Sequence, residues 1–170
     1  LKLLGAKYAI VSAKLLEANV GDSAYRNDPN SLTKQLARRA AQAMQEALNL
    51  SKVLKQSSKS EVELYVFIAG TYNLIGDNVE AIKLYEQALQ FSHQFNDTKP
   101  LQLNILSQIM LSKNILSSEH MKQKKYKSSL ALSNQTLGLV PQALRLAKEL
   151  NVPNEQKKIL EVQNDARYLI

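Results

Sequence analysis

The side chains that could do chemistry in this chain are widely separated. Its two histidines, His93 and His120, lack the neighbouring histidine or carboxylate spacing of a metal site, so we expect no bound metal. Cysteine is absent, which excludes disulfides, thiolate metal ligands and thiol nucleophiles. The five glycines form no phosphate-binding loop, and no serine lies in a nucleophile elbow. The sequence therefore predicts a non-enzymatic protein with no catalytic residues and no cofactor.

Positive charge is the second chemical feature of the chain, whose formal net charge is +7. Clustered lysines and arginines gain affinity for phosphate by releasing counterions. No Phe or Tyr platform alternates with these clusters, as single-stranded nucleic acid binding would need, so a solvated turn is the favoured interpretation. RNA, an acidic partner or an anionic membrane surface remain the alternatives. The basic residues in question are Arg38, Arg39, Lys122, Lys124, Lys125 and Lys127.

The composition indicates an all-α protein. Leu, Ala, Gln, Lys and Ser are abundant, whereas the residues that favour sheet, such as Val, Thr and Phe, are scarce. No apolar run approaches the ~18 residues that a transmembrane helix requires, so no transmembrane segment is predicted. The absence of cysteine does not fix the compartment, and among compartments the cytoplasm is favoured.

Apolar periodicity and capping signals place the helices. The pattern Ser60/Glu63 predicts the start of one helix and Asp77/Glu80 the start of another, with Gly76-Asp77 as the reversal between them. Proline inside a helix removes a hydrogen bond, so a kink or short break is expected at Pro141. The expected helices are residues 2–19, 31–56, 60–74, 77–95, 101–120, 126–150 and 154–169, with a lysine-rich turn at 121–125.

Small and aromatic residues between Val62 and His93 recur where two antiparallel helices would interlock. Alanines allow close backbone approach and aromatics fill the remaining volume. The residues of this pattern are Tyr65, Ile68, Ala69, Tyr72, Gly76, Ala81, Tyr85, Ala88 and Leu89. The pattern resembles a tetratricopeptide (TPR) repeat. This resemblance implies a TPR-like α-solenoid of antiparallel helix pairs, and an irregular helical bundle is the alternative.

An internal repeat extends this resemblance beyond one helix pair. Similar eight-residue segments occupy residues 47–54, 88–95 and 143–150, so the spacings are 41 and 55 residues. A period near 40 indicates helices longer than those of the ~34-residue TPR unit. We expect one repeat domain over residues 1–170, with helix pairs at 2–56, 60–95 and 101–150, and the start of a further helix at 154–169. In the last pair either Ser129 or Ala131 takes the small position.

The TPR resemblance also implies where a partner binds, because the first helix of each pair lines a concave groove. The matching positions are Glu63, Val66, Gly70 and Asn73, and by the 41-residue spacing Asn104, Ser107, Leu111 and Asn114. An asparagine amide can bond both a backbone N–H and a backbone C=O, which suits peptide binding. These residues could equally be the polar backs of amphipathic helices.

The sequence therefore predicts a protein-interaction scaffold or sensor module that holds a peptide, a helix or another domain of its own chain. Binding of RNA or an anionic surface through the basic residues is the alternative. Because the chain opens with Leu and ends on the apolar residues Tyr168-Leu169-Ile170, we expect it to be a fragment of a longer protein.

Overall fold

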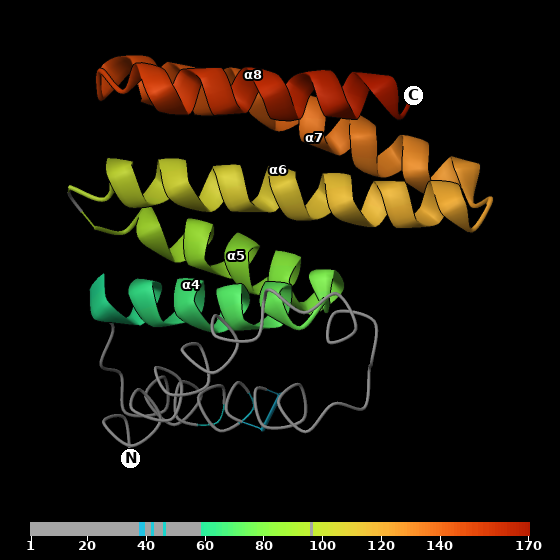
Figure 1. Cartoon of the computed structure of the whole chain (residues 1–170). Coiled ribbons are helices and arrows are strands. Elements are labelled where there is room, and N and C mark those ends of the chain that lie inside the picture. Colours follow the sequence, from blue (N-terminus) through green and yellow to red (C-terminus); the bar gives the residue numbers. More distant parts are fainter. Residues whose placement is uncertain (1–37, 40–41, 43–45, 47–58, 96) are drawn as a thin grey trace. The chain divides into compact units, whose positions relative to one another are not determined.

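The structure is a computed structural model that describes residues 38, 39, 42, 46, 59–95 and 97–170 (Figure 1). Within these residues every regular element is a helix. This confirms the all-α prediction for the described part of the chain. The helices are α4 (Lys59–Leu74), α5 (Asn78–Ser92), α6 (Lys99–Lys122), α7 (Tyr126–Glu149) and α8 (Pro153–Tyr168). None of these described helices is long and apolar enough to cross a membrane.

The chain divides into two compact units, residues 1–81 and 82–170. The first contains α4 and the second contains α6, α7 and α8, while α5 spans the boundary. The helices expected at 2–19 and 31–56 lie outside the described residues, apart from Arg38, Arg39, Gln42 and Glu46. These four residues are helical and exposed.

Three turns between helices share one backbone geometry, a Schellman motif that ends the preceding helix. After α4, the N–H of Asp77 donates to the carbonyl of Tyr72 at 2.9 Å, and Gly76 takes a left-handed φ of 82°. Lys124 (φ 61°) and Asn151 (φ 53°) occupy the same position after α6 and α7. The turns after α6 and α7 are so short that α6, α7 and α8 run alternately in opposite directions (Figure 1). The predicted reversal at Gly76-Asp77 and the lysine-rich turn are confirmed.

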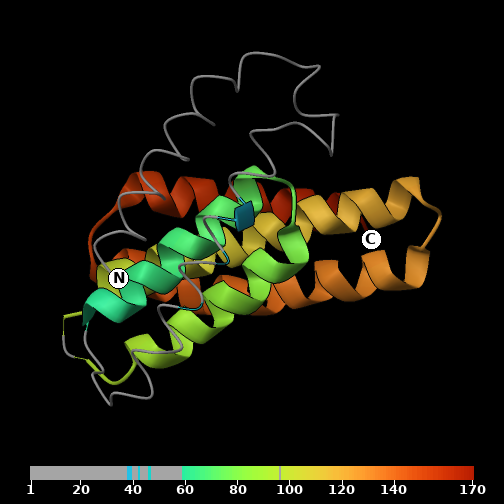
Figure 2. The ribbon, with the colours of Figure 1, turned by 90° about the horizontal axis from the view of Figure 1, so that it is seen from below.

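The core of the second unit lies among α6, α7 and α8, which all contact one another (Figure 2). Its buried members come from all three helices because each presents an apolar stripe at helical spacing. They are Leu103, Leu106 and Met110 of α6, Val140, Ala143, Leu146 and Ala147 of α7, and Ile159 of α8. Leu89 of α5 packs against the same cluster. The apolar surface that these side chains remove from water is the main stabilising term for the unit.

Buried hydroxyls continue this packing toward the α6–α7 turn. The Ser117 hydroxyl lies 2.9 Å from the carbonyl oxygen of Ser129, to which it donates, and within 2.9 Å of the hydroxyls of Ser129 and Ser133. All three serines are fully buried. Short side chains with hydroxyls let two backbones approach while satisfying their polar atoms. Of the two residues considered for the small position, Ser129 is buried and Ala131 is exposed.

Several predicted helix details hold and others are wrong. The alanines expected at close packing sites, Ala69, Ala81 and Ala88, are all fully buried. α8 begins at Pro153, as its start signal predicts. Of the kink or short break expected at Pro141, the break is wrong, because α7 continues through this residue. Buried Val140 and Ala143 on either side anchor the helix in the core, and this packing outweighs the local cost of the proline. α5 ends at Ser92, three residues before its expected end.

Candidate functional site

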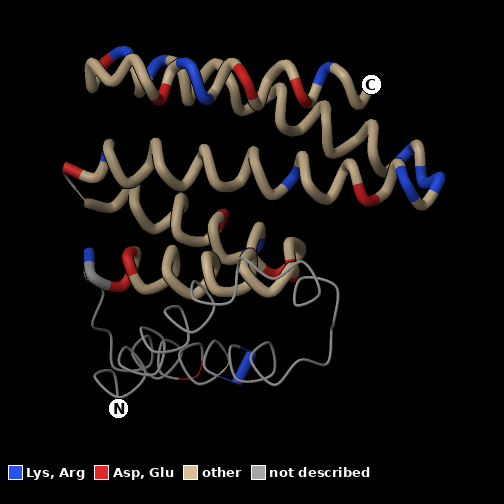
Figure 3. Tube along the Cα trace, in the orientation of Figure 1, with Lys and Arg blue, Asp and Glu red and all other residues tan. Residues whose placement is uncertain are grey.

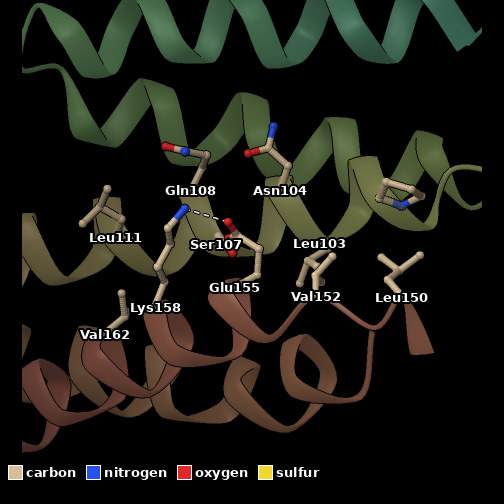
Figure 4. A pocket seen from close by; sticks show the side chains of 11 residues that line it. Leu103, Asn104, Ser107, Gln108, Leu111, Leu150, Val152, Glu155, Lys158 and Val162 are labelled. Carbon is tan, nitrogen blue, oxygen red and sulfur yellow. Dashed lines mark hydrogen bonds and ion pairs between the residues drawn. The ribbon is translucent and has the colours of Figure 1, made fainter. Parts of the chain in front are cut away.

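A hollow of about 450 Å³ lies between α6 and α8, and the turn before α8 closes one end (Figure 4). Its residues come from two helices that are not adjacent in sequence, brought together because both contact α7 and each other. The α6 wall consists of Pro100, Leu103, Asn104, Ser107, Gln108 and Leu111. The other wall consists of Leu150, Val152, Glu155, Lys158 and Val162.

The lining of this hollow combines apolar side chains with polar and charged ones. Leu111 is 43% exposed although it is a large apolar residue, so it offers surface that a partner can cover. Asn104 and Gln108, one helical turn apart, supply two amides on the α6 side. On α8, the Lys158 ammonium and the Glu155 carboxylate form an ion pair of 2.6 Å (Figure 4).

A second hollow, of about 460 Å³, continues along the same two helices. Leu111 lines both hollows, so together they form one groove, which we call the α6–α8 groove. The second part contains Asn114, Ile115, Ser118, Glu119 and Lys122 of α6, with Asp165, Tyr168 and Leu169 at the end of α8. Ile115 is 41% exposed and Tyr168 is 91% exposed, so this part also presents apolar and aromatic surface.

All four predicted binding residues of α6 line this groove, but Asn114 is engaged in the packing between the two helices. Asn104, Ser107 and Leu111 line it. Asn114 is only 7% exposed, and its Nδ2 donates to the carbonyl of Val162 at 2.8 Å. Its amide N–H therefore fastens α6 to α8 and is not available to a partner. We remove Asn114 from the set of expected contact residues.

The predicted residues of α4 lie at a spacing that places them on one helix face in the first unit. Glu63 is exposed, and Val66, Gly70 and Asn73 are partly exposed. The groove described above belongs to the second unit and is built without them.

Sequence reasoning missed more than half of the groove. Gln108 could have been found, since it lies four residues after Asn104 on the same helix face. The contributions of Glu155, Lys158 and Val162 had no signal in the sequence, because the repeat pattern does not say which side chains of the following helix face α6. Their positions emerge only from the packing of α8 against α6.

The predicted lysine cluster lies at the α6–α7 turn. Lys122, Lys124, Lys125 and Lys127 are all exposed there and form the concentration of positive charge at one end of the hairpin in Figure 3. Arg38 and Arg39 belong to the first unit and are also exposed.

Titratable groups in the described residues show no arrangement typical of an active site. No group of three or more histidine or acidic side chains there could hold a metal ion. Burial raises the pKa of the Tyr72 hydroxyl, with smaller contributions from Glu80 and Asp77. A hydrogen bond from Lys99 lowers the pKa of Glu149. Both shifts follow from helix packing and surface ion pairing rather than from convergence in a pocket.

Comparison with known proteins adds one structural similarity. No family model matches the chain, and no curated protein matches it. Among solved structures, the chain is similar to the one titled "Crystal structure of BtubC (BKLC) from P. vanneervenii", with 15% sequence identity and a TM-score of 0.33. The match covers 99% of this chain and 73% of that chain. A similarity at this level carries no argument about function.

Proposed function

We propose that this chain is a TPR-like helical-repeat module that binds a protein partner in the α6–α8 groove. The partner is a peptide, a helix or another domain of the same chain. The observation that carries the proposal is the groove itself, whose lining combines exposed Leu111 and two side-chain amides on α6 with an ion pair on α8. A surface of this kind fits a segment with apolar side chains and unpaired backbone groups.

Two features of the helix pairs support a repeat architecture. The same Schellman turn, with a left-handed residue at its centre, follows α4, α6 and α7. Small residues also recur where helices approach, at Ala81 and Ala88 of α5 and at Ser129 and Ala143 of α7. Repeated turn geometry and repeated small residues are what stacked helical hairpins require.

The groove offers two kinds of contact to a bound segment. Asn104 and Gln108 each carry a carbonyl acceptor and an NH₂ donor, so they can bond a partner backbone of any sequence. Leu111, together with Val152 and Val162, gives an apolar base that can cover a partner side chain. The amides therefore allow partners of different sequence to bind. The apolar surface favours partners that carry one or two aliphatic or aromatic side chains at the contact.

A peptide-display selection on the purified chain tests this proposal. The selected peptides are then measured against Leu111→Glu, with Leu160→Glu as the matched control, because Leu160 of α8 is similarly exposed (45%) and lies outside the groove. We expect Leu111→Glu to weaken binding at least ~10-fold, a typical effect for a central interface residue, and Leu160→Glu to have little effect. Equal effects of the two substitutions would count against the groove.

Phosphate-driven binding through the basic residues is the competing proposal, favoured only by the exposure of the lysines at the α6–α7 turn. Ionic strength distinguishes the two modes. Binding to phosphate weakens steeply as salt rises, whereas the binding of an uncharged peptide in the groove changes little. If the selected ligands bind with a steep salt dependence that charge reversal at the lysines abolishes, the groove proposal is wrong.

A further inference from the structure

The end of the α6–α7 hairpin carries four exposed lysines. Within the described residues, no ion pair and no side-chain hydrogen bond involves the ammonium group of Lys122, Lys124, Lys125 or Lys127. Glu119 is the nearest carboxylate in sequence. We call these four residues the lysine tip (Figure 3). The positive charges of these lysines repel one another, so contact with an anionic surface would be electrostatically favourable.

Exposed apolar side chains lie beside the lysine tip. Tyr126, the first residue of α7, is 59% exposed, and Leu130 is 42% exposed. They are four residues apart in a helix and therefore lie on the same face, one turn from each other. The end of the hairpin thus combines cations with an aromatic and an aliphatic side chain, which is the composition of a protein segment that contacts a membrane interface.

The backbone of the tip also favours a role for Lys124 other than stability. Lys124 has a left-handed φ of 61°, at the position that Gly76 and Asn151 occupy in the two equivalent turns. Glycine and asparagine tolerate this conformation, whereas a lysine is strained there. Side chains held in such conformations are concentrated at functional sites. The strain at Lys124 is consistent with a requirement for its charge.

We propose that the lysine tip, with Tyr126 and Leu130, docks this chain on an anionic lipid bilayer. A bilayer surface presents phosphate and carboxylate head groups above hydrocarbon, and so can satisfy both the cations and the apolar side chains. Nucleic acid fits less well, because the tip has no arginine for bidentate phosphate contacts and a single aromatic residue where stacking would need several. The lysine tip shares Lys122 with the far end of the α6–α8 groove, but this proposal does not depend on partner binding in the groove.

Vesicle flotation with the full chain tests this site. The probes are vesicles of phosphatidylcholine alone and vesicles of an equimolar mixture of phosphatidylcholine and phosphatidylserine. We expect binding to the mixed vesicles only, weakening as salt rises. Changing the four tip lysines to glutamine should reduce the partition coefficient at least ~10-fold.

The matched control changes four other exposed cations to glutamine, namely Arg145, Lys148, Lys157 and Arg167, which lowers the net charge by the same amount. For the apolar side chains, Leu130→Gln is compared with Leu160→Gln, and only the first should weaken vesicle binding. Circular dichroism establishes that each variant keeps its helix content. Equal losses in the two lysine and arginine variants would overturn the proposal, as would binding of an RNA oligonucleotide without binding of the mixed vesicles.

Discussion

Asn114 of α6 donates a hydrogen bond from Nδ2 to the backbone carbonyl of Val162 in α8, at 2.8 Å. The two residues are far apart in sequence, and Asn114 is only 7% exposed. A side chain that bonds to the backbone of another helix fixes both the distance and the register between the two. Because α6 and α8 form the walls of the groove, this bond helps to set the groove's width.

We predict that Asn114→Ala lowers the free energy of unfolding by about 1–2 kcal/mol, the usual cost of losing a buried hydrogen bond. Asn114→Asp should cost more, about 3 kcal/mol, because it places an unpaired carboxylate next to a carbonyl oxygen. Urea unfolding followed by circular dichroism measures both values. Exposed Asn134 of α7 is the control, and its alanine variant should change stability by less than about 0.5 kcal/mol. An equal effect at positions 114 and 134 would show that the bond contributes nothing.

Lys113, the neighbour of Asn114, is a buried cation with two polar partners. It is 7% exposed, and its Nζ lies 3.0 Å from Glu86 Oε1 of α5 and 2.8 Å from Gln135 Oε1 of α7. Removing one of these partners leaves the buried ammonium poorly compensated. Removing the ammonium costs less, because both partners remain accessible to water: the Glu86 side chain is 52% exposed, and Gln135 is also exposed.

We therefore predict that Lys113→Met changes the free energy of unfolding by less than about 1 kcal/mol, because the methionine keeps the apolar stem and removes the desolvated charge. Gln135→Leu should destabilise by about 1–3 kcal/mol, since it withdraws an acceptor from the buried ammonium. The double variant Lys113→Met/Gln135→Leu should regain most of the stability that Gln135→Leu loses, because the ammonium that needed the acceptor is gone. Thermal denaturation of the four proteins measures the coupling, and strictly additive effects would contradict the interaction.

Pro141 offers a prediction of increased stability. It is an exposed residue within α7, and a proline there lacks the N–H that would donate to the carbonyl four residues earlier. Replacing it with alanine restores that hydrogen bond, so Pro141→Ala should stabilise the chain by about 1–3 kcal/mol. Chemical denaturation provides the measurement, and Gln142→Ala at the next position controls for a general gain in helix propensity. No gain at Pro141 would indicate that the α7 backbone is already adapted to the proline.

Local signals in the sequence were enough to predict most helix limits in the described region. Gly76-Asp77 and Pro153 act through backbone conformations that depend on the residues themselves, so the reversal and the start of α8 are confirmed. The break expected at Pro141 also rests on a local rule, but there the apolar contacts of Val140 and Ala143 decide the outcome. Local rules fail where a strong tertiary contact opposes them.

The candidate groove was less predictable than the helices. A fixed 41-residue spacing transferred the expected contact positions from α4 to α6, and three of them, Asn104, Ser107 and Leu111, line the first hollow. It could not anticipate that Asn114 would meet Val162, since the spacing carries no information about the helix that packs next. The same absence of information explains why Glu155 and Lys158 were missed.

The three turn residues with a left-handed φ predict an order of stability for variants that exchange glycine with another residue at these positions. Lys124→Gly should increase the free energy of unfolding by up to about 1 kcal/mol, because glycine adopts a φ of 61° without strain. Asn151→Gly should have a smaller effect, since asparagine already tolerates this conformation, and Gly76→Ala should be destabilising. Thermal unfolding tests the order. A destabilised Lys124→Gly would show that the lysine side chain contributes stability, and would remove the strain argument from the membrane proposal.

The last prediction concerns Glu149 at the end of α7, whose carboxylate accepts a hydrogen bond from Lys99 Nζ at 2.8 Å. This bond and the lysine charge hold the pKa of Glu149 below its ordinary value of 4.5, with a smaller contribution from Arg145. A carboxyl group whose pKa is lowered by folding stabilises the folded state above pH 4.5, and this contribution disappears as the pH falls through the lowered pKa.

In the Lys99→Gln variant, the pKa of Glu149 measured by NMR titration should therefore rise toward 4.5. The loss of stability on acidification below that pH should also become shallower. Both side chains are well exposed, so the change in stability is small and the titration is the more sensitive measurement. Arg145→Gln is the control, since its Nε lies 3.9 Å from the carboxylate and should shift the pKa less. An unchanged pKa in Lys99→Gln would mean that the ion pair between the start of α6 and the end of α7 does not persist in solution.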